Sequence, residues 1–221
     1  MSLLPNIEVN PTSKATASVI WLHGLGADGS DFEAIVPQLN LPKDSSIRFI
    51  FPNAPAIPVT INGGFVMPAW YDILEMNIER KVDEQQLMQS AKAVHALIDH
   101  EITRGIDSRR IILAGFSQGG AVCYQAALSY DKPLGGLIAM STYFATAHTV
   151  ALNAANRSLP IHIYHGSRDA MVAESLGHKA KQTLQAMAFT PAYDTYTMEH
   201  EVCLEQIADI SRQLQTWLTV S

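Results

Sequence analysis

Short apolar runs alternate with longer amphipathic segments along most of the chain. Near-continuous apolar runs are typical of parallel strands that are covered on both faces. Five such runs and a sixth, more polar one predict strands at residues 18–23, 47–51, 111–116, 134–140, 161–164 and 192–198.

The segments between these runs have the spacing of helices with one apolar face. Residues 202–218, for example, carry Ile207, Ile210, Leu214 and Leu218 on one stripe. The same reading predicts helices at residues 83–103, 119–128, 172–187 and 202–218. Alternating strands and helices predict an α/β fold with a mostly parallel central sheet and helices on both faces. Ligands of such sheets bind beyond the carboxyl ends of the strands.

Residues 52–72 interrupt the alternation. They are rich in proline and glycine and have no helical period, and loops of this length are usually functional. Phe65, Met67 and Trp70 could line an apolar substrate pocket. The alternative is a surface loop with a small core of its own.

Composition narrows the class of protein. The chain has 221 residues, 48% of them hydrophobic and 16% charged, which predicts one globular domain over residues 1–221. The net charge of −6 does not suggest a nucleic-acid partner. No apolar stretch reaches the ~18 residues of a membrane span. The polar N-terminus lacks a signal peptide's apolar core, so we expect a cytoplasmic protein with Cys123 and Cys203 reduced.

The motifs of cofactor and metal sites are missing from the sequence. There is no phosphate-binding loop, no dinucleotide fingerprint after a strand and no paired-cysteine metal motif. We therefore expect no cofactor and no metal.

A G-x-S-x-G pattern, Gly115 to Gly119, lies between a predicted strand and a predicted helix. In this setting it predicts a nucleophile elbow, a strained turn that holds the hydroxyl of Ser117 in the open. The glycines let strand and helix cross closely, and the helix amides point toward the serine. A glycine-rich turn with an incidental serine is the alternative.

A serine hydroxyl needs a base to take its proton. In folds with this elbow, an acid and then a histidine follow the serine along the chain. His200 is the candidate base because it lies between the last predicted strand and the last helix. His23 precedes the serine and is interpreted as an anchor of its own loop. The histidines not chosen are His148, His162, His165 and His178.

Asp169 is the candidate acid because it follows the strand at 161–164, at the expected edge of the sheet. There it could orient His200 and stabilise the imidazolium. Glu199 and Glu201 flank His200 and stay open as alternatives. The carboxylates set aside because of their position in turns, strands or helices are Asp131, Asp194 and Asp209.

An oxyanion hole needs two backbone N–H donors near the reacting carbonyl. One is expected from Gln118, which follows the nucleophile. The second is expected from Leu25, because Gly24 and Gly26 would let its backbone approach a substrate closely. Met171 and Val172, near the candidate acid, complete a tentative substrate pocket with Leu25.

Six segments together resemble one enzyme family: LHGLGADGSDF (22–32), FPNAP (51–55), PVTINGG (58–64), AWYD (69–72), GFSQGG (115–120) and HGSRDAMV (165–172). The combination is similar to the carboxylesterases and acyl-protein thioesterases, serine hydrolases of the α/β-hydrolase fold, over nearly the whole chain. The resemblance implies the triad Ser117, Asp169 and His200 and an oxyanion hole of the Leu25 and Gln118 amides.

The resemblance also implies a range of substrates and partners. Family members hydrolyse short to medium acyl esters, and some act on palmitoylated proteins or lysophospholipids. Several form homodimers. A carboxylic ester hydrolase is the leading hypothesis, with a fatty-acyl thioesterase or lysophospholipase as the rival. A non-catalytic binding protein on the same fold is the hypothesis from another class.

Two positions depart from the family pattern. Glu199 stands where the family usually has a glycine before the histidine, which would strain the backbone if that position needs a positive φ. Ala173 replaces the usual proline after Val172, and at the start of a helix this loss is expected to be harmless.

Overall fold

The computed structural model describes residues 3–42, 45–75 and 80–218. Within them, seven strands form the central sheet in the order β1-β3-β2-β8-β9-β10-β11. All neighbours pair in parallel except β1, which is antiparallel to β3. The strands are β1 (Asn6–Val9), β2 (Ala17–Leu22), β3 (Ile47–Pro52), β8 (Ile111–Phe116), β9 (Gly136–Met140), β10 (Ile161–Gly166) and β11 (Ala192–Tyr196).

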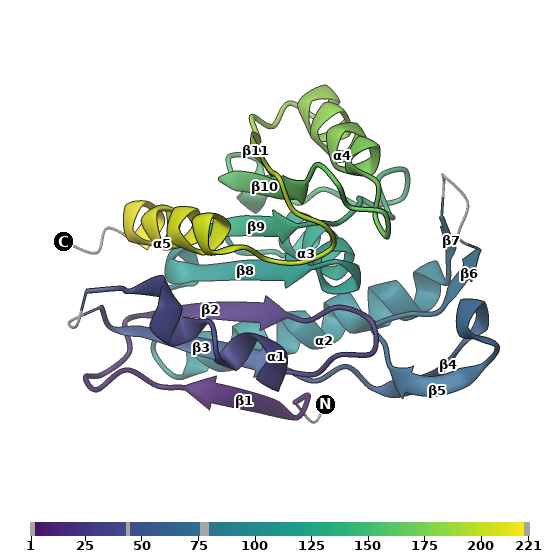
Figure 1. The fold of residues 1–221 in the computed structure, drawn as a ribbon. Coiled ribbons are helices and arrows are strands. Elements are labelled where there is room, and N and C mark those ends of the chain that lie inside the picture. The colour runs from purple at the N-terminus through teal and green to yellow at the C-terminus, as the bar shows by residue number, and fades with distance from the viewer. Residues whose placement is uncertain (1–2, 43–44, 76–79, 219–221) are drawn as a thin grey trace.

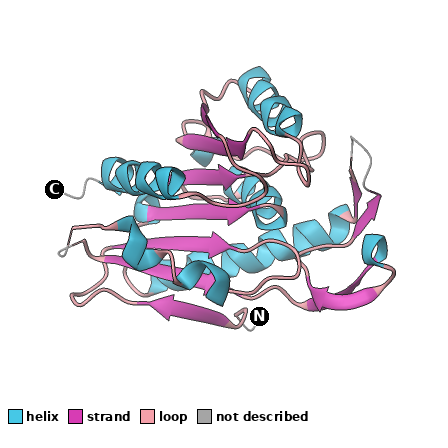
Figure 2. Cartoon of the chain, viewed as in Figure 1, coloured by secondary structure: helices cyan, strands magenta, loops and turns pink. Residues whose placement is uncertain are grey.

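Helices cover both faces of this sheet (Figures 1 and 2). Helix α2 (Glu84–Thr103) and helix α3 (Gln118–Ser129) lie behind it in Figure 1, and α1 (Ser30–Glu33) and α5 (Leu204–Leu218) lie in front. Helix α4 (Glu174–Ala186) packs on β10. Short 3₁₀ turns are η1 (Val36–Leu39), η3 (Ser108–Arg110) and η4 (Ala154–Asn156). The predicted α/β fold with a mostly parallel sheet is thus confirmed.

The sheet separates two apolar cores, and successive residues of a strand enter different ones. Ile20 and Leu22 of β2 pack on the side of α2 and α3, whereas Val19 and Trp21 pack on the side of α5. Because side chains alternate across a strand, a strand buried on both faces must be apolar throughout. All six residues of β2 are buried, as its unbroken apolar run predicts.

The six predicted strands and four predicted helices are present with small shifts at their ends. Strand β1 was not predicted, because the first fourteen residues were interpreted only as a short polar terminus. Its register places Asn6 opposite Pro52 at the edge of the sheet. None of the helices in the described residues is long and apolar enough to cross a membrane.

Most of the segment at residues 52–72 forms a hairpin beside the sheet. Strands β4 (Ala56–Val59) and β5 (Phe65–Pro68) pair antiparallel around the 3₁₀ turn η2 (Thr60–Asn62). The Asp72 carboxylate binds the turn of the hairpin by accepting from the amide and the hydroxyl of Thr60, at 2.7 and 2.6 Å. A second small sheet follows, with β6 (Ile73–Glu75) and β7 (Lys81–Val82).

A buried carboxylate joins several of these elements. The Glu101 side chain in α2 is fully buried and lies 2.7 Å from a guanidinium nitrogen of Arg48 in β3 and 2.9 Å from one of Arg104. It also accepts from the Ser18 hydroxyl in β2. Buried charges need such partners, since an uncompensated one is costly.

Candidate active site

Ser117 occupies the turn between β8 and α3 with a φ of 52° and a ψ of −121°. A positive φ is unfavourable for any residue with a side chain, so neighbouring contacts must maintain it. The Ser117 amide donates to the carbonyl of Met140 at 2.9 Å, and its carbonyl accepts from the Thr142 hydroxyl at 2.6 Å. Strand β9 and the loop that follows it therefore hold the turn.

Glycines make this turn sterically possible. A Cβ atom at Gly115 would lie 2.6 Å from the carbonyl oxygen of Gly119, and one at Gly119 would lie 2.5 Å from that of His23. Real Cβ atoms do not approach so closely. The glycines thus allow α3 to start against the ends of β8 and β2, as the elbow pattern requires.

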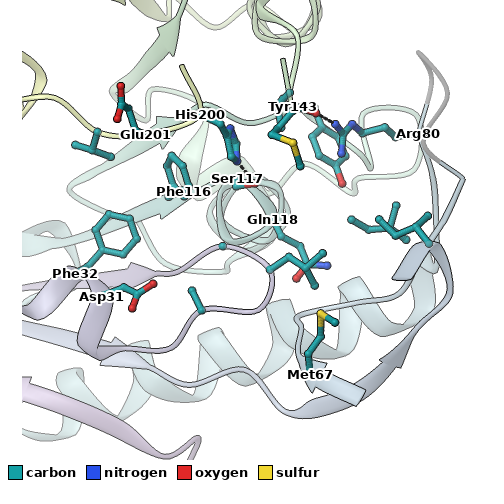
Figure 3. A pocket seen from close by; sticks show the side chains of 18 of the residues that line it. Asp31, Phe32, Met67, Arg80, Phe116, Ser117, Gln118, Tyr143, His200 and Glu201 are labelled. Carbon is teal, nitrogen blue, oxygen red and sulfur yellow. Dashed lines mark hydrogen bonds between the residues drawn. The ribbon is translucent and has the colours of Figure 1, made fainter. Parts of the chain in front are cut away.

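Three side chains from separate loops meet at the carboxyl edge of the sheet. His200 Nε2 lies 2.9 Å from Ser117 Oγ, and His200 Nδ1 lies 2.7 Å from Asp169 Oδ2. The Asp169 side chain is fully buried, whereas that of His200 is 19% exposed. Figure 3 shows the imidazole directly above the serine, with Phe116 beside it at a ring-centroid distance of 4.7 Å.

The surroundings of Asp169 favour its ionised carboxylate, which can orient a histidine. Burial raises the pKa of its carboxyl group, but hydrogen bonds from His200 and from the Val172 amide outweigh burial and keep that pKa below its usual value. Oδ1 accepts from the amides of Met171 and Val172 at 2.9 and 2.7 Å. The ionised carboxylate then favours a proton on Nδ1 of His200, which leaves Nε2 free to accept the proton of Ser117.

The Leu25 and Gln118 amides donate no hydrogen bond to any of the described residues. Gln118 is the first residue of α3, where backbone N–H groups have no partner within the helix. The Leu25 loop lies against the nucleophile, because a Cβ atom at Gly24 would lie 3.4 Å from that of Ser117. Two unpaired donors beside a serine hydroxyl can stabilise an oxyanion.

His23 anchors this loop. Its Nδ1 lies 2.7 Å from the carbonyl oxygen of Gly24, and its Nε2 accepts from the Ala54 amide at 3.1 Å. Burial lowers the pKa of the imidazole, so the neutral ring with a proton on Nδ1 fits both contacts. His23 follows β2, far along the sheet from β11, the strand that precedes His200.

A cavity of about 760 Å³ opens at Ser117 (Figure 3). Its walls combine apolar side chains with a few polar and charged ones. The lining includes Leu25, Phe32, Ile61, Met67, Ile73, Arg80, Phe116, Ser117, Tyr143, Met171, Val172 and His200. This combination suits an apolar ligand whose polar group lies at the serine.

Comparisons with known proteins show the family of this chain. The phospholipase/carboxylesterase family model matches residues 5–218. The chain belongs to the phospholipase/carboxylesterase family. It is 36% identical to acyl-protein thioesterase 1 of Neurospora crassa over 92% of this chain and 87% of that protein. It is 38% identical to acyl-protein thioesterase 1 of Schizosaccharomyces pombe over 82% and 81%.

Solved structures show the same relationship. The crystal structure of Arabidopsis thaliana SOBER1 superposes with a TM-score of 0.85 at 31% identity, over 91% of this chain and 99% of that one. Family membership makes the chain a hydrolase of the esterase and thioesterase type with the α/β-hydrolase fold. The hydrolase and esterase assignments made from the sequence are confirmed at this general level.

Two residues expected in the substrate pocket of this family member do not line the cavity. Trp70 is 1% exposed, and its indole N–H donates to the carbonyl of His23 at 2.9 Å, so it packs against the start of the loop that carries Leu25. Phe65 begins β5 and is 74% exposed. Met67, two residues later, does line the cavity, as do Leu25, Met171 and Val172.

The Glu199 backbone has no positive φ. Glycine is required instead at Gly166, the last residue of β10, because a Cβ atom there would lie 2.5 Å from the carbonyl oxygen of Glu199. Glu199 and Glu201 are both exposed. At the other departure, Ala173 caps α4, which begins normally at Glu174.

Some residues of the site were missed from the sequence. The Gln118 side chain accepts from the Trp70 amide at 2.8 Å and donates to the Tyr71 carbonyl at 2.6 Å, which ties the elbow to the segment after the hairpin. Tyr143 follows β9, so the rule about strand ends could have identified it. Nothing in the sequence pattern marked Arg80.

His165 binds the loop that carries Asp169. Its Nε2 lies 2.8 Å from the Val172 carbonyl and 3.7 Å from Asp169 Oδ2, and burial lowers the pKa of the ring. A neutral imidazole there donates to Val172 and leaves Asp169 to pair with His200.

Proposed function

We propose that this protein is a serine carboxylic ester hydrolase that works through an acyl-enzyme, with Ser117, His200 and Asp169 as its catalytic triad. The observation that carries the proposal is the chain of two hydrogen bonds from Ser117 Oγ through His200 to Asp169, at 2.9 and 2.7 Å. Such a chain supplies the base that a serine nucleophile needs.

In the first half-reaction, Ser117 Oγ attacks the acyl carbonyl while His200 Nε2 takes the hydroxyl proton. The resulting oxyanion accepts from the Leu25 and Gln118 amides. When the tetrahedral intermediate collapses, His200 returns the proton to the leaving oxygen or sulfur, and an alcohol or thiol departs. Ser117 then carries the acyl group as an ester.

In the second half-reaction, His200 takes a proton from water as the water oxygen attacks the acyl-enzyme. Collapse of this second intermediate breaks the ester bond, returns the proton to Ser117 Oγ and releases the carboxylic acid. Asp169 keeps its charge throughout and stabilises the imidazolium that forms in each half.

The proposal is tested by replacing the nucleophile. Ser117→Ala should lower the turnover of p-nitrophenyl butyrate on the order of 10⁶-fold or to background, because no second hydroxyl replaces Oγ. Ser129→Ala is the matched control, since Ser129 lies at the far end of α3, where its hydroxyl donates to the Gln125 carbonyl. Unchanged turnover in Ser117→Ala would favour a binding protein on this fold.

A thioesterase for fatty-acylated proteins, or a lysophospholipase, is the second candidate. The related fungal proteins are named acyl-protein thioesterases, and the apolar walls of the cavity suit an alkyl chain. Matched octanoyl ester and octanoyl thioester substrates separate the two candidates by their kcat/KM. A strong preference for acetyl groups would contradict the fatty-acyl candidate.

The proposed mechanism uses no cofactor and no metal, whether the substrate is a small molecule, a lipid or an acylated protein. A homodimer and a cytoplasmic location stay predictions, and so does the single domain over residues 1–221.

A further inference from the structure

A second cavity lies next to the active-site cavity, and the two share part of their lining. It measures about 520 Å³, and Arg80 and Tyr143 border both cavities. Its other lining includes Phe144, Ala145, Leu176 and Ala180, with charged groups such as Glu84 and Lys179. The proposed mechanism makes no use of this space.

Arg80 is held between the cavities by contacts on two sides. Its guanidinium carbon lies 5.0 Å from the centroid of the Tyr143 ring, a cation–π arrangement. The same guanidinium donates to the carbonyl of Met171, on the loop that carries Asp169. Figure 3 shows the arginine beside the tyrosine, on the side of Ser117 opposite to Asp31 and Glu201.

Tyr143 is the fixed part of this pair. It is 5% exposed, and its hydroxyl lies 2.8 Å from that of Tyr71, which is fully buried. Arg80, by contrast, has a φ of 43°, which is unusual for a residue with a side chain. The contacts of its side chain with Tyr143 and Met171 hold the guanidinium at the boundary of the two cavities.

We propose that Arg80, stacked on Tyr143, forms a barrier at the end of the active-site cavity and so limits the length of the acyl chain that the cavity binds. This inference rests on the proposed function. An alkyl chain that extends away from Asp31 and Glu201 meets the guanidinium, and going further requires loss of the ring contact and the hydrogen bond to Met171. Removal of the arginine side chain would join the two cavities and let a longer chain continue over Phe144 and Leu176.

The test compares p-nitrophenyl acetate, butyrate, octanoate, laurate and palmitate in the wild type and in Arg80→Gly. Glycine is chosen because it adopts the positive φ without strain. In the wild type, kcat/KM should rise with chain length, by up to about fourfold for each buried methylene, and then fall before palmitate. In Arg80→Gly the rise should continue, and the ratio of laurate to butyrate should increase at least about tenfold.

Two further variants sharpen this comparison. Arg80→Lys keeps a long cationic side chain and should retain most of the wild-type length profile. Arg109→Ala removes an arginine that is 71% exposed at the other end of β8, and it should leave the profile unchanged. Melting temperatures show whether each variant folds, and Arg80→Ala replaces the glycine variant if that one does not.

Three results would overturn the barrier. They are an unchanged ratio of laurate to butyrate in Arg80→Gly, an equal loss of activity at every chain length, and a wild-type optimum at palmitate. Failure of the proposed function looks different, because Ser117→Ala would then hydrolyse p-nitrophenyl butyrate as fast as the wild type.

Discussion

Asp169 shows how one side chain is fitted to two partners. One carboxylate oxygen accepts from the amides of its own loop, and the other accepts from His200. The loop thus fixes the acid, and the acid fixes the ring. This arrangement predicts that the role of Asp169 depends on its being an acceptor and not only on its size.

Asp169→Asn tests that role. The new amide can donate to His200 Nδ1, which would shift the ring proton to Nε2 and block transfer from Ser117. We expect kcat for p-nitrophenyl butyrate to fall about 10⁴-fold at neutral pH, with a melting temperature near that of the wild type. A loss smaller than tenfold in a folded variant would show that Asp169 does not orient the base.

The meeting point of the proposed triad could be derived from the sequence, whereas the walls of the cavity could be derived only in part. Ser117, Asp169 and His200 each follow a strand, and the carboxyl ends of parallel strands share one edge. Trp70 and Phe65 were misjudged because an aromatic residue in a long loop can pack inward, as Trp70 does, or face solvent, as Phe65 does. Arg80 depends on contacts with residues far away in the chain, and no local pattern reports these.

At the scale of elements, α3 and the end of β2 approach so closely that only a glycine fits at position 119. A Cβ atom there would meet the carbonyl oxygen of His23 and the side chain of Leu22. Helix propensity alone favours alanine over glycine by up to about 1 kcal/mol. The two effects have opposite signs, so a substitution shows which of them is larger.

Gly119→Ala should lower the free energy of unfolding by about 1–3 kcal/mol, because backbone atoms cannot move aside cheaply. Urea denaturation measures this change. Gly24→Ala is the comparison, since its nearest neighbour is a Phe116 side-chain atom at 3.3 Å, and it should cost less. A gain in stability for Gly119→Ala would contradict the close approach of helix and strand.

Strands buried on both faces were easier to predict from the sequence than edge strands and the pairing of short strands. Strand β2 is apolar at every position because both of its faces are covered, and this makes it recognisable. Strand β1 is half-buried and partly polar at the sheet edge, so its four residues carry no such pattern. The hairpin at residues 56–68 depends on pairing between short strands and on the carboxylate of Asp72, which proline and glycine content alone does not reveal.

At the scale of the molecule, one sheet brings together loops that are far apart in the chain. The loop after β2 lies against Ser117 after β8, and the loops after β10 and β11 meet at Asp169 and His200. On the other side of this framework, Glu101 links α2 to β2 and β3. The site therefore depends on the whole α/β sandwich holding four loops in place.

The central claim is that Ser117 is a nucleophile activated by His200, and covalent labelling tests it most directly. A fluorophosphonate reacts with an activated serine, and peptide mass spectrometry locates the adduct. We expect a single stoichiometric adduct on Ser117 in the wild type, and little or none in folded His200→Ala. An unlabelled wild type, or an adduct on another residue, would contradict the account.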